Sequence, residues 1–178
     1  MVKHFMYGAS KNVFYVGLLS YFLGLLSKEN TITFLGVIPI SFYFFNDTTR
    51  SSSIFKSLLW LSLVTFVYLI WRFNVSGVPN MSQKINDLMN NPFLEMNGAQ
   101  KLATITYTLG WYIKLLIVPY PLTHDYYPYA IPIMNWSNWK VLLSLSIYIG
   151  LIYLGYKEYK KRSVVGYGIW FYLITLTI

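Results

Sequence analysis

The chain has 178 residues, of which 56% are apolar, 20% are aromatic and only 11% are charged. A soluble domain carries about 25% charged residues, so this composition excludes an ordinary water-facing surface and predicts an integral membrane protein. The absence of cysteine excludes a disulfide scaffold and any thiolate metal site or nucleophile.

Basic residues outnumber acidic ones by 14 to 6, which gives a formal net charge of +8. Such an excess indicates nucleic-acid binding when it clusters on a polar surface. Most of these residues instead lie at the borders of apolar stretches, as at Lys28, Arg72 and the run 157–162. Because lysine and arginine at such borders anchor helices to lipid headgroups, we expect membrane lipid, and not nucleic acid, as their partner.

Five stretches are apolar enough to form helices that cross a bilayer, whose core takes roughly 20 helical residues. These stretches are 12–27, 31–45, 57–71, 141–156 and 163–178. The last one ends without a polar flank, so we interpret the chain as a fragment. Residues 1–178 are then part of one larger transmembrane domain.

A sixth helix is predicted over 100–118, and it differs from the other five. Its polar and aromatic positions recur at steps of three or four and share one face: Lys101, Thr104, Thr108, Trp111 and Lys114. This pattern predicts an amphipathic helix that lies in the interface or re-enters the bilayer. If this helix crossed the membrane, the basic residues would divide eight against five between the two faces. If it did not cross, they would divide eight against six. The positive-inside rule therefore does not decide between the two arrangements. The predicted fold is an all-α polytopic bundle of about five spanning helices plus this one.

Lys28 and Glu29 lie in the short connection between the first two apolar stretches. The simpler interpretation is a hydrated hairpin turn, because helix ends commonly carry charges. The alternative is that Lys28 lies beside a lipid phosphate as a point charge, with Glu29 as its orienting partner. Both interpretations stay open at this stage.

The segment His124-Asp125-Tyr126-Tyr127 lies in a proline- and tyrosine-rich connection after the amphipathic helix. It suits an interfacial aromatic belt, a polar loop or a sugar site, because aromatic faces and a carboxylate match a pyranose ring and its hydroxyls. An aspartate there could also accept the proton of an acceptor hydroxyl. One histidine next to one aspartate is not a metal-ligand set, so no metal is expected.

Several motifs together resemble the transmembrane and tetratricopeptide-repeat O-mannosyltransferase family. They are Ser-Lys-Glu at 27–29, Asn-Pro at 91–92, Lys101 at the start of a helix, Leu-Leu-x-x-Pro-x-Pro-Leu-Thr-x-Asp-Tyr at 115–126 and Ile-Pro at 131–132. The resemblance runs from about Leu18 to the end. Lys101 stands where the family more often has arginine, and Tyr126 where animal members have tryptophan. The family's acidic first loop, its later Arg-Tyr motif and its C-terminal repeats are missing from the chain.

The resemblance implies a multi-pass class C glycosyltransferase that moves a sugar, mannose in this family, from a polyprenyl-phosphate donor to hydroxyls of an acceptor protein or glycan on the extracytoplasmic side. It implies no cofactor beyond this lipid-linked substrate. Lys28 and Lys101 become candidate phosphate binders, Asp125 and Glu29 candidate catalytic residues, and His124, Tyr126 and Tyr127 candidate walls of the sugar or acceptor site. The principal base would lie outside this chain.

Two non-enzymatic alternatives remain. One is half of a transporter or flippase, in which the amphipathic helix lines a path and Lys114 pairs with a carboxylate. Against it, transporters usually carry charge in the middle of a span, and the five apolar stretches do not. The other is a structural membrane subunit without a site.

Overall fold

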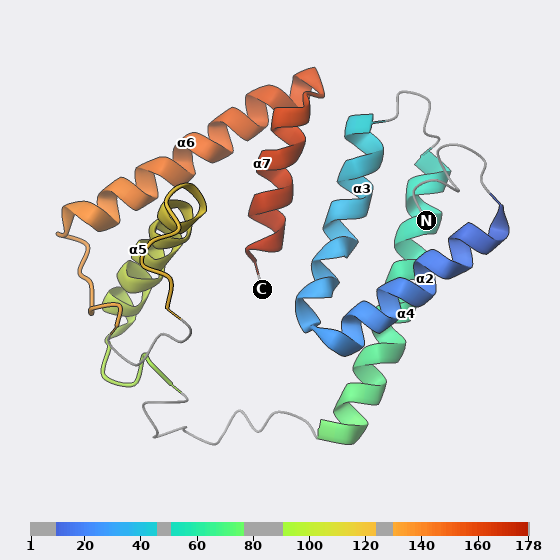
Figure 1. The fold of residues 1–178 in the computed structure, drawn as a ribbon, viewed down its shortest axis with the longest axis horizontal. Coiled ribbons are helices and arrows are strands. Elements are labelled where there is room, and N and C mark those ends of the chain that lie inside the picture. The colour runs from blue at the N-terminus through green and yellow to red at the C-terminus, as the bar shows by residue number, and fades with distance from the viewer. Residues whose placement is uncertain (1–9, 46–50, 77–90, 124–129, 178) are drawn as a thin grey trace. The chain divides into compact units, whose positions relative to one another are not determined.

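The computed structural model describes residues 10–45, 51–76, 91–123 and 130–177, with the side chains of 51–53 and 76 left aside. All regular structure in these ranges is helical, without any strand (Figure 1). The elements in chain order are α2 (Lys11–Ser27), the 3-10 helix η1 (Glu29–Thr33), α3 (Phe34–Phe45), α4 (Ser51–Ser76), α5 (Gly98–Ile117), α6 (Trp139–Lys161) and α7 (Val164–Thr175). The all-helical prediction is confirmed, and each of the six predicted segments contains a helix.

The number of membrane crossings is a separate matter from the number of helices. Two helical segments in the described ranges, Ile54–Val75 and Trp139–Lys160, have 22 residues each and are long and apolar enough to cross a membrane. Helix α2 has 17 residues, and α3 and α7 have 12 each. Twelve residues rise only about 18 Å, against a hydrocarbon core of about 30 Å. The total of five crossings therefore stays a prediction.

The chain divides into two compact units, and each is described by itself. Unit 1 comprises residues 1–79 and 153–178, and unit 2 comprises residues 80–152. Helix α6 contributes its last turns to unit 1 and its earlier turns to unit 2.

Helices α2 and α4 of unit 1 pack side by side and run in the same direction. Their contacts advance together along both helices, from the rings of Phe14 and Trp60, 6.0 Å apart, to the hydrogen bond between Tyr21 and Thr65. The buried core between them consists of Tyr21, Leu25, Leu61 and Tyr68. The two α4 members, Leu61 and Tyr68, are seven residues or about two turns apart, so a single stripe of α4 faces α2.

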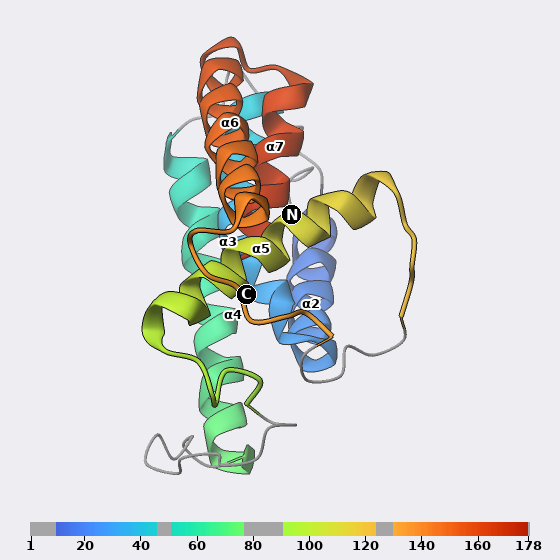
Figure 2. The ribbon, with the colours of Figure 1, turned by 90° about the vertical axis from the view of Figure 1, so that its left-hand side faces the viewer.

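Helix α3 follows α2 through η1 and packs against α4 and α7. Near the start of α3, Gly36 lies against Ile174 at the end of α7. Near the end of α3, the hydroxyl oxygens of Ser41 and Tyr167 are 3.1 Å apart. Helices α3 and α7 are therefore antiparallel. Helix α7 begins at a tight turn directly after α6, and Figure 2 shows the two helices meeting there.

Unit 2 is built on the close approach of α5 and α6. The start of α5 is fixed by a reciprocal capping box, in which Asn97 accepts from the amide of Gln100 and Gln100 accepts from that of Asn97. Farther along, a Cβ added to Gly110 would lie 2.7 Å from the Cβ of Ser144 on α6. Small residues at such a crossing let two helix backbones approach closely.

We predict that Gly110→Ala destabilises unit 2, because the new methyl overlaps Ser144. Overpacking of this kind typically costs about 1–3 kcal/mol. Gly150→Ala on α6 is the matched control, because nothing lies within 4 Å of a Cβ added there. The control should be neutral or stabilise by up to about 1 kcal/mol through helix propensity. Unfolding of both variants in detergent, followed by circular dichroism, makes the comparison, and equal stability would contradict this packing.

Candidate functional site

The predicted tip at Lys28 is a turn between α2 and α3. The amide of Lys28 donates to the carbonyl of Gly24 and closes α2, at an N–O distance of 2.8 Å. The carbonyl of Lys28 accepts from the amide of Thr31 at 3.1 Å and so opens η1. The side chains of Lys28 and Glu29 are exposed at this turn. Helix α3 begins at Phe34, later than predicted, because Glu29–Thr33 winds as a 3-10 helix.

Glu29 forms an ion pair with Arg72 of α4. The sequence predicted Lys28 as the partner of Glu29 and placed Arg72 only at the border of an apolar stretch. The Arg72 guanidinium also donates to the hydroxyl of Tyr68 at 2.9 Å. Both charged side chains remain accessible, with 57% of Glu29 and 40% of Arg72 exposed. The turn therefore places three charged groups, from Lys28, Glu29 and Arg72, at one end of unit 1.

The same stripe of α4 carries a second polar contact deeper in the unit. The hydroxyls of Tyr21 and Thr65 are 2.8 Å apart, and Thr65 also donates to the carbonyl of Leu61 at 2.9 Å. Thr65 has only 5% of its surface exposed. The side of α4 that faces α2 thus changes from hydrogen-bonded hydroxyls in the interior to an ion pair at the end.

A cavity of 490 Å³ lies between α2, η1, α3 and α7. Its walls are mostly apolar, and its hydroxyls come from Ser20, Tyr21, Thr31, Ser41 and Tyr167. The volume is within the range of small-molecule sites. A mostly apolar wall with scattered hydroxyls suits an apolar ligand or a lipid chain better than a sugar.

Unit 2 contains a groove of 360 Å³ between α5 and α6. Two indoles and two ammonium groups line it, from Trp111 and Lys114 on α5 and Trp139 and Lys140 on α6. The Nζ of Lys114 lies 4.6 Å from the centre of the Trp111 ring, and the Nζ of Lys140 lies 6.0 Å from that of Trp139. Aromatic faces beside cations suit a sugar with a phosphate.

The segment after α5 is tied to this groove. Lys114 donates a hydrogen bond to the carbonyl of Tyr120, three residues beyond the end of α5. The motif at 115–126 therefore starts at the groove, and Lys114 holds its backbone at Tyr120. Sequence reasoning placed Trp111 and Lys114 on one face of this helix but missed Trp139 and Lys140. These two begin the next helix, and only the fold shows that they face α5.

Lys101, the other predicted phosphate binder, lies in the first turns of α5 in unit 2. It is exposed, and its Nζ lies 5.0 Å from the centre of the Phe93 ring. Lys28 belongs to unit 1, so each lysine is described only in its own surroundings. A shared phosphate site for the two stays a prediction.

The predicted catalytic and wall residues of the loop, His124, Asp125, Tyr126 and Tyr127, lie outside the described residues. Their roles stay predictions. Among the residues that are described, no three His, Asp or Glu side chains come together to hold a metal ion.

The chain was compared with protein-family models, curated proteins and solved structures. None of these comparisons gives a match. The resemblance to the mannosyltransferase family therefore rests on the motifs in the sequence alone.

We predict that Tyr21→Phe lowers the free energy of unfolding by about 0.5–1.5 kcal/mol, because it removes the hydrogen bond to Thr65. Thr65 keeps its bond to the Leu61 carbonyl, so no buried group loses every partner. Tyr15→Phe on the same helix is the control. Because 60% of Tyr15 is exposed, loss of its hydroxyl should have little effect on the free energy of unfolding. Denaturation of both variants in detergent tests the prediction, and equal effects would mean that the Tyr21–Thr65 bond contributes no net stability.

Proposed function

We propose that this chain is part of a membrane-embedded glycosyltransferase that transfers a sugar, mannose by resemblance, from a polyprenyl-phosphate donor to a hydroxyl on the extracytoplasmic side. The observation that carries the proposal is the motif at 115–126, together with the groove to which Lys114 ties it. The groove offers indole faces for a sugar and ammonium groups for a phosphate, which are the two parts of such a donor.

The exposed surfaces of the long helices support a membrane location. In the most apolar windows of Ile54–Val75 and Trp139–Lys160, only 22% and 17% of the residues are buried. A core helix of a soluble protein would be mostly buried. Exposed positions of α4 include Leu59, Leu63, Phe66 and Ile70, and an apolar patch of this extent is typical of a surface that meets lipid or a partner.

Hydroxyl groups on the helices support the same location. They bond to the carbonyl four residues earlier at Ser41, Thr65, Thr106, Thr108, Ser144, Ser146 and Thr175. A hydroxyl that bonds its own helix needs no water. The helices can therefore carry serine and threonine into an apolar solvent at little cost.

In the proposed reaction, a carboxylate takes the proton of the acceptor hydroxyl, and cations stabilise the departing polyprenyl phosphate. Lys28 and Lys101 would hold the phosphate, and Glu29 and Asp125 are the candidate carboxylates. The pairing of Glu29 with Arg72 suits a positioning role for Glu29, because its carboxylate is already engaged by the guanidinium. His124, Tyr126 and Tyr127 would form the wall of the sugar or acceptor site.

In the transporter alternative, Lys114 would pair with a carboxylate in the transport path. The contacts described for Lys114 are the Tyr120 carbonyl and the Trp111 ring. These contacts favour a lysine that shapes a groove at the membrane surface. Transfer of a labelled sugar from a polyprenyl phosphate by the full-length protein tests the proposal directly, and transport of the donor without transfer would favour the alternative.

We predict that Lys28→Ala in the full-length protein lowers transfer at subsaturating donor by roughly ten- to a hundredfold, the loss of one charge-assisted hydrogen bond to phosphate. Lys11→Ala is the control, because Lys11 lies at the opposite end of α2 and should leave transfer unchanged. The assay measures sugar transferred per amount of inserted protein. Normal transfer by the Lys28 variant would remove this lysine from the donor site.

We also predict that cysteines introduced at Ser82 and Ser137 of this Cys-free chain both react with an impermeant thiol reagent from the extracytoplasmic side. The two positions flank α5, so both react only if α5 does not cross. A cysteine at Thr48, between α3 and α4, is the control and should react only after the membrane is permeabilised. Reaction of just one of Ser82 and Ser137 would establish the six-crossing arrangement.

A further inference from the structure

The cavity between α2, η1, α3 and α7 in unit 1 has a wall without charged groups. None of the described residues that line it is a lysine, arginine, histidine, aspartate or glutamate. A charged headgroup enclosed by such a wall would lose its hydration without gaining a partner of opposite charge, which is costly. The cavity therefore suits an uncharged ligand, and its volume of 490 Å³ is in the range of sites that hold small molecules.

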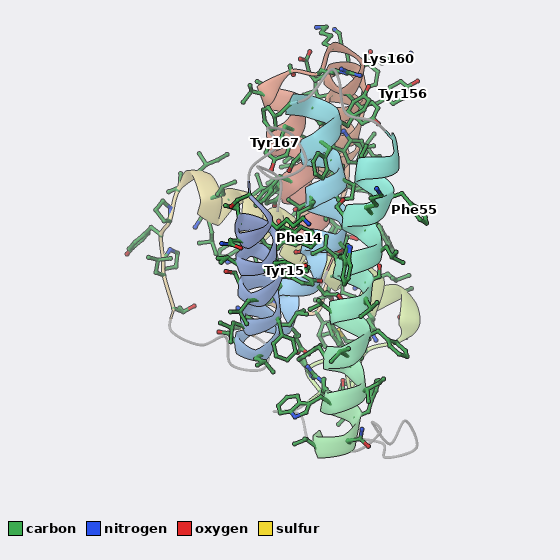
Figure 3. All side chains as sticks on the ribbon, turned by 90° about the vertical axis from the view of Figure 1, so that its right-hand side faces the viewer. Phe14, Tyr15, Phe55, Tyr156, Lys160 and Tyr167 are labelled. Carbon is green, nitrogen blue, oxygen red and sulfur yellow. The ribbon has the colours of Figure 1, made fainter. Side chains whose placement is uncertain are left out.

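The polar side chains of this wall are hydroxyls, and the pair formed by Ser41 and Tyr167 has a defined hydrogen-bond direction. Ser41 donates its single proton to the carbonyl of Val37, at an O–O distance of 2.8 Å. The contact of 3.1 Å between the hydroxyl oxygens of Ser41 and Tyr167 then uses the proton of Tyr167. Figure 3 shows Tyr167 close to α3, where this pair forms. The Tyr167 oxygen is left with lone pairs, so it can accept a further hydrogen bond but cannot donate one.

Tyr21, on the α2 side of the cavity, has its proton committed in the same way. Thr65 donates to the carbonyl of Leu61, so the 2.8 Å contact between Tyr21 and Thr65 uses the proton of Tyr21. Only 6% of Tyr21 is exposed, and its hydroxyl is bonded to α4. The acceptor that a ligand can reach is therefore the half-buried pair of Ser41 and Tyr167. A ligand that matches this pair carries a hydrogen-bond donor.

We propose that this cavity binds a lipid-soluble alcohol, whose apolar body lies against the wall and whose hydroxyl donates to the oxygen of Tyr167. A hydroxyl is uncharged and can both donate and accept, so it also matches Ser20 and Thr31, which line the same cavity. An amide would bring more polar groups than a mostly apolar wall can satisfy. Sterols and linear long-chain alcohols share the required chemistry.

This site is separate from the one proposed for sugar transfer. Its lining residues belong to unit 1, whereas the groove with indoles and ammonium groups belongs to unit 2. A polyprenyl phosphate needs cations for its headgroup, and the cavity wall offers none. The inference is therefore independent of the proposed function, and a failure of one leaves the other standing.

The test measures the binding of tritium-labelled cholesterol and, separately, of tritium-labelled hexadecanol to the full-length protein in an uncharged detergent. We expect saturable binding of one alcohol or of both, which identifies the source as a sterol, a linear alcohol or either. The methyl ether of each alcohol keeps the apolar body but has no proton to donate. It should compete about three- to tenfold more weakly than the alcohol, because one hydrogen bond is lost. Hexadecyl phosphate should also compete more weakly than hexadecanol, because the wall has no cation.

Tyr167→Phe removes the acceptor while the ring stays in the wall. The variant should bind the alcohol about as weakly as the unchanged protein binds the methyl ether, and its affinity for the ether should stay the same. Ser41 keeps its bond to the Val37 carbonyl, so we expect a folded protein, which the melting temperature checks. Tyr15→Phe, at a position of α2 that is 60% exposed and outside the cavity, is the matched control and should keep the preference for the alcohol.

A second pair of variants locates the ligand. Ser20→Phe adds a ring at the cavity wall and should abolish saturable binding, whereas Leu19→Phe adds similar bulk outside this cavity and should leave binding unchanged. Saturable binding of neither alcohol overturns the proposal. So does equal competition by alcohol and ether, tighter binding of hexadecyl phosphate, or a full preference for the alcohol in Tyr167→Phe. Loss of binding in Leu19→Phe but not in Ser20→Phe would place the ligand elsewhere and overturn it as well.

Discussion

The arrangement of this chain depends on one constraint, which is that so few charges cannot hydrate so much apolar surface. Charged residues make up 11% of the sequence, and the long helices leave most of their apolar positions exposed. In an apolar solvent, backbone groups must be satisfied within the helix, and the side-chain hydroxyls follow the same rule by bonding to carbonyls of their own turns. Charges are then left to the helix ends, where water and headgroups can solvate them.

Within unit 1, this constraint separates two chemically different ends. At one end, Glu29 is paired with Arg72 beside the exposed Lys28, so the three charges sum to +1. At the other end, residues 157–162 hold four basic residues and one acidic one beside the stacked rings of Tyr43 and Tyr159. In the proposed function, the cations of the first end hold a phosphate and its carboxylate orients a neighbour. The antiparallel packing of α3 on α7 keeps the two ends apart.

Most of the helices could be predicted from the sequence because an apolar run and a period of 3.6 are local signals. The 3-10 turn at Glu29–Thr33 shortened α3 relative to its prediction, since a run of apolar residues does not show where winding changes. The contacts that define the sites could not be predicted. Arg72 is 43 residues from its partner Glu29, and Tyr43 is 116 residues from Tyr159. No spacing rule connects such positions, so only the packing of the helices brings them together. Trp139 and Lys140 were missed for the same reason.

The orientation of the chain in a membrane depends on where its basic residues lie. Counted along the sequence, the basic residues divide almost evenly between the two faces, so the positive-inside rule gives no answer. The rule depends on lysine and arginine close to the ends of spanning helices, and acidic residues contribute little to it, so the ion pair of Arg72 with Glu29 leaves the count unchanged. In unit 1, residues 157–162 hold four basic residues, against Lys28 and Arg72 at the other end. This local difference favours a cytoplasmic position for 157–162 and an extracytoplasmic one for Lys28, which is the side on which a polyprenyl-phosphate donor is used in the proposed reaction.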